Sequence, residues 1–148
     1  MSNPVLLLHG FTGSVESTWV PTGIVELLGD AGREVIAWDL PGHGTAEKHH
    51  DPGAYAEMEQ ELVSRLPEGQ VDGVGFSMGA RTLLCMAAIA PEKFGRLVVS
   101  GVGRNLFERD EAQAERIAKG VQGDAADDDV HAQTFARYAA EPDQDKKK

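Results

Sequence analysis

The stretch V-D-G-V-G-F-S-M-G-A-R at residues 71–81 decides the fold of this chain. Its first six residues form a largely apolar run that predicts a strand, and residues 78–90 are apolar nearly all round, which predicts a buried helix. Between them lies G-x-S-x-G at residues 75–79, where small residues allow a sharp turn. Such a turn lifts the serine hydroxyl clear of the sheet. The stretch therefore predicts a strand–turn–helix unit that presents Ser77 as a candidate nucleophile.

A glycine-flanked loop follows the first apolar run of the chain. Residues 5–8 read V-L-L-L and predict a strand, and residues 9–14 read H-G-F-T-G-S. Attack on a carbonyl creates an oxyanion that needs two N–H donors. The amide of Met78, at a helix N-terminus, is one candidate, and the amide of Phe11 in this loop is the other. We therefore expect Ser77, Phe11 and Met78 to act together.

A third motif, D-L-P-G-H-G at residues 39–44, closes a predicted strand at residues 34–38. The three motifs, in their order and spacing, resemble the α/β-hydrolase family, and the resemblance covers residues 4–103. It implies a serine nucleophile that forms an acyl-enzyme with a small-molecule ester or related acyl substrate. No cofactor is needed for this chemistry. No metal is expected either, because the histidines show no ligand spacing and the acidic run at residues 127–129 lacks the features of a calcium loop.

The expected fold class is α/β, a parallel sheet of about four strands flanked by helices and followed by a helical lid-like segment. Alternating strands and helices predict such a sheet. The expected strands are 5–8, 34–38, 71–76 and 97–100, and the expected helices are 18–28, one from Asp51-Pro52 to Pro67, and 78–90. We assign residues 1–103 to the core. Residues 104–148 form an acidic segment with two polar helices, 110–121 and 130–140. The resemblance implies a lid there, and a solvated helical pair is the alternative.

The composition and net charge of the chain exclude several classes of binding partner. The chain has 148 residues and a formal net charge of −10, which argues against binding nucleic acid or an anionic membrane surface. The apolar run at residues 5–8 is too short for a signal peptide or a membrane span. The single cysteine, Cys85, excludes an internal disulfide and fits a reducing cytoplasm. We expect a cytoplasmic protein that acts on a small molecule.

The acid and base that Ser77 needs are not recognisable. The family order is Ser, then Asp or Glu, then His. In the family, His9 and His43 are structural. His131 is the only histidine after Ser77, but it lies in a polar helical segment rather than at a strand end. We therefore expect an N-terminal portion of a longer enzyme that lacks the later strands, with an unpaired sheet edge that invites self-association.

Other readings remain open. Arg81 lies one helical turn after Ser77, and S-M-G-A-R resembles the MenH-like branch, whose enzymes eliminate pyruvate from a succinyl-cyclohexadiene carboxylate. The resemblance implies that Arg81 contacts a substrate carboxylate, and pairing with surface acids such as Glu92 is the alternative.

A protein with this fold but without catalytic activity, acting as a scaffold, is a third interpretation. A dinucleotide-binding loop is disfavoured, because no acid follows the next strand. Trp19 and Phe76 suit an acyl pocket or the core, and core is favoured for Phe76.

Overall fold

A four-stranded parallel sheet forms the centre of the protein. The computed structural model describes residues 2–108 and 110–139. The strands run in the order β2-β1-β3-β4 across the sheet. Their bounds are Val5–Leu8 for β1, Val35–Trp38 for β2, Val71–Phe76 for β3 and Phe94–Ser100 for β4. The predicted α/β class and its parallel sheet are confirmed.

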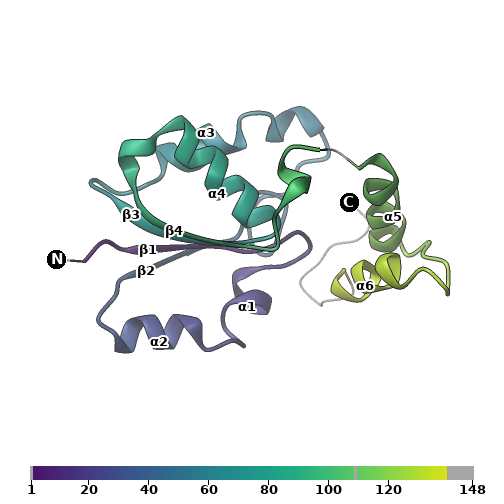
Figure 1. Ribbon diagram of the computed structural model, residues 1–148, viewed down its shortest axis with the longest axis horizontal. Helices are drawn as coiled ribbons and strands as arrows, with labels where there is room; N and C mark the ends of the chain where they lie inside the picture. The colour runs from purple at the N-terminus through teal and green to yellow at the C-terminus, as the bar shows by residue number, and fades with distance from the viewer. Residues whose placement is uncertain (1, 109, 140–148) are drawn as a thin grey trace.

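Helices cover both faces of this sheet (Figure 1). One face carries α1 (Val15–Thr18) and α2 (Ile24–Asp30), and the other carries α3 (Met58–Ser64) and α4 (Met78–Ile89). Among the described residues, three short 3-10 turns join the elements, at Pro52–Tyr55, Pro91–Lys93 and Arg104–Leu106. Parallel strands need such crossover connections, so each helix returns the chain to the amino end of the sheet.

The central strand β1 divides the core into two layers. Leu6 and Leu8 pack with Leu83 and Met86 of α4, while Val5 and Leu7 pack with Trp19 on the opposite face. All four side chains of β1 are buried. A strand buried on both faces reads as continuous apolar sequence, which is why V-L-L-L does not alternate. Each of these side chains stabilises the fold by about 2 kcal/mol through burial. Trp19 therefore belongs to the core.

The region after β1 differs from the expected single helix at residues 18–28. The chain forms α1 and α2 there, separated by a turn. Ser14 caps α1 by accepting from the Ser17 N–H at 3.0 Å, and the Ser17 hydroxyl accepts from the Ser14 N–H at 2.9 Å. Before α2, Gly23 adopts φ 71°. A reciprocal cap starts the first helix early, and the left-handed glycine separates it from the second.

The chain after β4 forms a helical hairpin. Helices α5 (Glu111–Gln122) and α6 (Val130–Tyr138) match the two predicted polar helices, except that residue 140 lies outside the described residues. They lie beyond the carboxyl ends of the strands (Figure 1). Gly120 packs so closely on α6 that a Cβ there would clash with the carbonyl of Ala132. No helix in the described ranges is long and apolar enough to cross a membrane.

Candidate active site

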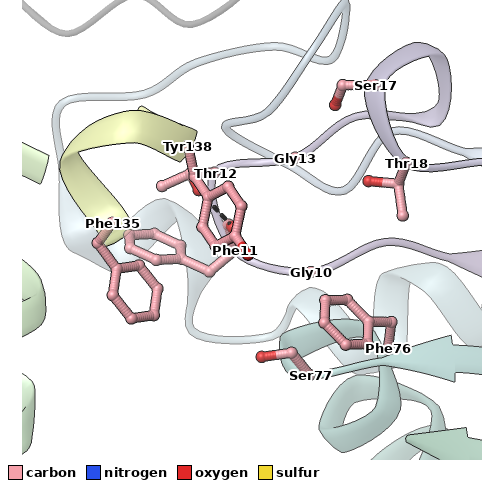
Figure 2. Close-up of a pocket in the computed structure, with 10 residues that line it drawn as sticks. All are labelled: Gly10, Phe11, Thr12, Gly13, Ser17, Thr18, Phe76, Ser77, Phe135 and Tyr138. Atoms are coloured by element: carbon pink, nitrogen blue, oxygen red, sulfur yellow. Dashed lines mark hydrogen bonds between the residues drawn. The ribbon is translucent and has the colours of Figure 1, made fainter. Parts of the chain in front are cut away.

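Ser77 occupies the turn between β3 and α4. Its backbone has φ 53° and ψ −114°, a conformation that side-chain-bearing residues rarely adopt. The Ser77 N–H donates to the carbonyl of Ser100 at 2.7 Å, which holds the turn against β4. The Ser77 hydroxyl points into an open cavity (Figure 2). The strand–turn–helix unit expected from G-x-S-x-G is therefore present.

Two glycines allow this turn to form. A Cβ on Gly75 would lie 2.6 Å from the Cα of Ala80, and a Cβ on Gly79 would clash with the backbone carbonyls of Leu8 and His9. Both contacts involve backbone atoms, which have little room to move. Small residues at these two positions let α4 begin directly against β1 and β3.

The loop after β1 lies beside Ser77. A Cβ on Gly10 would come within 3.4 Å of the Ser77 Cβ and within 2.9 Å of the Phe76 ring, so a side chain here would displace that ring. Within the described part of the chain, no hydrogen bond uses the N–H of Phe11. Met78 is the first residue of α4, and its N–H is one of the amides that a helix leaves without an internal partner. Both candidate donors are thus available for a ligand.

His9 fixes this loop to the next motif. The N–H of Leu40 donates to His9 Nε2 at 3.0 Å, so Nε2 carries no proton. In the neutral ring the proton then lies on Nδ1, which donates to the carbonyl of Gly10 at 2.8 Å. His9 is fully buried. Its role is structural, as the resemblance implied.

Asp39 makes a second connection between the motifs. Its Oδ1 accepts from the N–H of Val15 at 2.7 Å, and its Oδ2 accepts from the N–H and the hydroxyl of Thr45 at 2.8 and 2.9 Å. Burial by itself would raise the pKa of Asp39, but the hydrogen bonds from Thr45 and Val15 outweigh it, so the pKa lies below its ordinary value. Asp39 therefore accepts backbone N–H groups from two other segments of the chain.

A cavity of about 360 Å³ opens in front of Ser77. Its walls are formed by Gly10, Phe11, Thr12, Gly13, Ser17, Thr18, Phe76, Ser77, Phe135 and Tyr138 (Figure 2). Ser77 and Phe11 thus line one cavity, and Met78 is not among its described lining residues. Phe76 is 44% exposed and lines the wall, so the expectation that it belongs to the core is wrong. Its place at the end of β3 turns the ring out of the sheet.

Arg81 lies outside this cavity. It is exposed on α4 and is not one of the residues that line the wall. The described ion pairs do not join it to Glu92 either. The side chain starts one helical turn after Ser77, on the solvent-exposed part of α4.

Two wall residues, Phe135 and Tyr138, were missed by sequence reasoning. They lie three residues apart on α6 and so share one face of that helix. Their spacing was a visible signal, but the sequence alone did not show that the hairpin folds back over the strand ends.

No described histidine serves Ser77. The Ser77 hydroxyl makes no hydrogen bond within residues 2–108 and 110–139. His131 packs edge-on against Phe135 with ring centroids 5.3 Å apart, and it does not line the cavity. His43 packs edge-on against Phe11, with ring centroids 5.6 Å apart. Burial lowers the pKa of His43. In the described ranges, no group of three His, Cys, Asp or Glu side chains could hold a metal ion.

The sheet, the strained serine turn and the adjoining glycine loop define an α/β protein with its site at the carboxyl ends of the strands. Residues 3–140 match the model of the alpha/beta hydrolase fold family. The chain belongs to this family.

Individual relatives match parts of the chain. Protein PHYLLO, chloroplastic, of Arabidopsis thaliana is 38% identical over 110 residues, 65% of this chain and 6% of that protein. Esterase YbfF of Escherichia coli (strain K12) is 31% identical over 101 residues, 66% of this chain and 37% of the esterase. The crystal structure of NosK from Streptomyces actuosus covers 95% of this chain and 60% of NosK, with a TM-score of 0.64 and 21% identity. The chain thus spans little more than a third of the esterase.

Proposed function

We propose that this chain carries the nucleophile half of a serine hydrolase that cleaves an ester or related acyl bond. Ser77 Oγ attacks the substrate carbonyl, the alcohol leaves with a proton, and an acyl-enzyme forms that water then hydrolyses. The N–H groups of Phe11 and Met78 stabilise the oxyanion, each contributing about 3 kcal/mol. No metal or cofactor takes part.

The observation that carries this proposal is the backbone of Ser77. A serine held at φ 53° between a strand and a helix, with its hydroxyl in a cavity, costs the fold about 1–3 kcal/mol. Such strain is maintained by the packing of Gly75 and Gly79 and presents the hydroxyl to a ligand. Family membership and the esterase name of one relative support the same chemistry.

All five histidines of the chain lie among the described residues, so we propose that a histidine from another segment completes the site. Ser77 Oγ has no base among them, and a serine hydroxyl is a weak nucleophile without one. We therefore propose that the 148-residue chain alone reacts slowly or not at all. The proposed enzyme and the alternative of a non-catalytic scaffold predict different results when a histidine base is supplied. Ser77 becomes reactive in the enzyme and stays unreactive in the scaffold.

The MenH-like alternative requires a carboxylate bound near Ser77. Arg81 would contact that carboxylate, but it lies outside the cavity wall, and none of the described residues on the wall is an Asp, Glu, Lys or Arg. This arrangement favours an ester substrate. The net charge of −10 supports a small-molecule partner rather than nucleic acid, and the cytoplasm remains the proposed compartment.

Labelling with a fluorophosphonate tests the proposal. The intact mass of the wild-type chain, of Ser77→Ala and of Ser17→Ala would be measured after treatment, since Ser17 is the other serine on the wall. We expect any adduct to be lost only in Ser77→Ala, and an adduct that survives there would refute the assignment. If the wild type reacts, loss of labelling in His131→Ala would identify His131 as the base. If the folded chain does not react even beside a histidine-bearing segment that completes the sheet, the scaffold reading holds.

A further inference from the structure

Four aromatic side chains surround the cavity in front of Ser77. Phe11 and Phe76 come from the sheet side of the site, and Phe135 and Tyr138 come from α6. Figure 2 shows Phe11, Phe135 and Tyr138 gathered on one side of Ser77, with Phe76 on the other, and the hydroxyl of Ser77 pointing toward the first group. Large aromatic side chains left exposed around one cavity indicate a surface that binds a ligand.

None of the described residues on the cavity wall has a charged side chain. Its polar side chains are the hydroxyls of Thr12, Ser17, Thr18, Ser77 and Tyr138. A charged group placed here would lose its hydration without gaining an opposite charge, which is costly. A neutral group with an aromatic ring would instead gain edge-to-face or offset contacts with the ring faces of the wall.

The hairpin holds the two aromatic residues of α6 in place. Arg116 of α5 donates to both carboxylate oxygens of Asp129 at 2.9 Å, and Asp129 accepts from the N–H of Ala132 at 3.0 Å, which caps α6. Phe135 lies edge-on between His131 and Tyr138, with centroids 5.3 and 6.1 Å away. These contacts cap α6 and set the orientation of Phe135 relative to its neighbours on that helix.

We propose that α6 gives this site its specificity, and that the substrate is an ester or related acyl compound bearing a neutral aromatic ring. The ring lies against Phe135 and Tyr138, with its reacting carbonyl at Ser77. The proposal rests on the proposed function for the reaction, but the ring-binding surface exists independently of the chemistry. Phe135 and Tyr138 are specificity-determining residues and take no part in bond making.

Binding to the Ser77→Ala chain tests the proposal without requiring catalysis. Three probes that the site does not cleave would be compared by ligand-detected NMR titration. They are N-methyl-2-phenylacetamide, its cyclohexyl counterpart, and its ring-carboxylated derivative. We expect the neutral aromatic probe to bind about three- to ten-fold more tightly than the cyclohexyl probe, and the carboxylated probe to bind most weakly.

Two variants separate the aromatic wall from mere apolar volume. Phe135→Leu combined with Tyr138→Leu should remove the preference for the aromatic probe and leave cyclohexyl binding nearly unchanged. Phe107→Leu is the matched control, since Phe107 is 89% exposed and does not line the cavity. If the double variant does not fold, Tyr138→Leu alone serves, because that side chain is 54% exposed.

Three results would overturn the proposal. They are equal affinity for the three probes, tightest binding of the carboxylated probe, and no binding of any probe. The second result would point to Arg81 and the MenH-like alternative. Fluorophosphonate labelling is read separately, so a site that binds rings without an activated serine would refute the proposed function and leave the ring specificity standing.

Discussion

Asp39 joins three segments of the chain around the cavity. Its carboxylate accepts hydrogen bonds from the start of α1 and from Thr45, while the residue itself follows β2. The side chain is only 11% exposed, so donors that lose this acceptor have limited access to water. The glycine loop beside Ser77 is therefore held in place by an acceptor that never meets the substrate.

Replacing Asp39 by asparagine should lower the free energy of unfolding by about 2 kcal/mol at pH 7. The asparagine side chain keeps one acceptor oxygen, but its NH₂ group faces a donor that the second carboxylate oxygen of Asp39 accepts from in the wild type. Urea denaturation of both proteins over a pH series measures the effect.

The difference in the free energy of unfolding between the wild type and Asp39→Asn should also depend on pH. The fold lowers the pKa of Asp39, so its stabilisation is complete above the ordinary value of about 3.9 and is lost as the pH falls through the lower folded value. The other carboxyl groups titrate in both proteins and cancel. A difference that stayed constant throughout the acid range would contradict this role.

At the scale of elements, the packing of α4 against β1 depends on Gly79. Gly79→Ala should destabilise the fold by about 3 kcal/mol, because its Cβ would meet two backbone carbonyls of the neighbouring strand. Gly29→Ala in α2 is the control. A Cβ there meets nothing within 4 Å, so this helix should gain roughly 0.5–1 kcal/mol. Thermal unfolding of the two variants compares them, and equal shifts in the unfolding temperature would show that the turn at Ser77 packs more loosely than the structure indicates.

Helices and strands could be predicted from the sequence where neighbouring residues alone determine their ends. Strand β3 at Val71–Phe76 has the predicted bounds, because an apolar run ends at a glycine turn. The helix expected at residues 18–28 was wrong, because the Ser14–Ser17 cap and the left-handed Gly23 were not recognised as boundaries. Both missed boundaries depend on the backbone conformation or capping of single residues, and the spacing of apolar residues does not indicate these.

The candidate site was predictable in part for a related reason. The motifs identify the loops that meet at the strand ends, because parallel strands bring their carboxyl ends to one edge. The cavity wall contributed by α6 depends on how a distant hairpin docks, and so does the outward position of Phe76. Those contacts are tertiary, so even the three-residue spacing of Phe135 and Tyr138 does not show where their side chains dock.

At the scale of the whole molecule, β4 forms one edge of the sheet. Within the described residues, its outer side pairs with no strand, and Val98 is 59% exposed. An open edge with apolar side chains is a template for pairing with another chain. We therefore expect the isolated protein to self-associate as its concentration rises.

Val98→Lys should shift this association to higher concentrations, because a charged side chain on an edge strand opposes pairing. Leu27→Lys makes the same kind of change on the exposed side of α2, away from the sheet edge, and should leave the association unchanged. Sedimentation velocity over a concentration series measures both. Monomeric wild-type protein at every concentration would show that this edge is protected.

The conformation of Ser77 also limits how stable this turn can be. Glycine would adopt that backbone without strain, so serine is the less stable choice at position 77. The hydroxyl that faces the cavity is therefore present at a cost to folding, and a variant selected for stability alone would be expected to lose it.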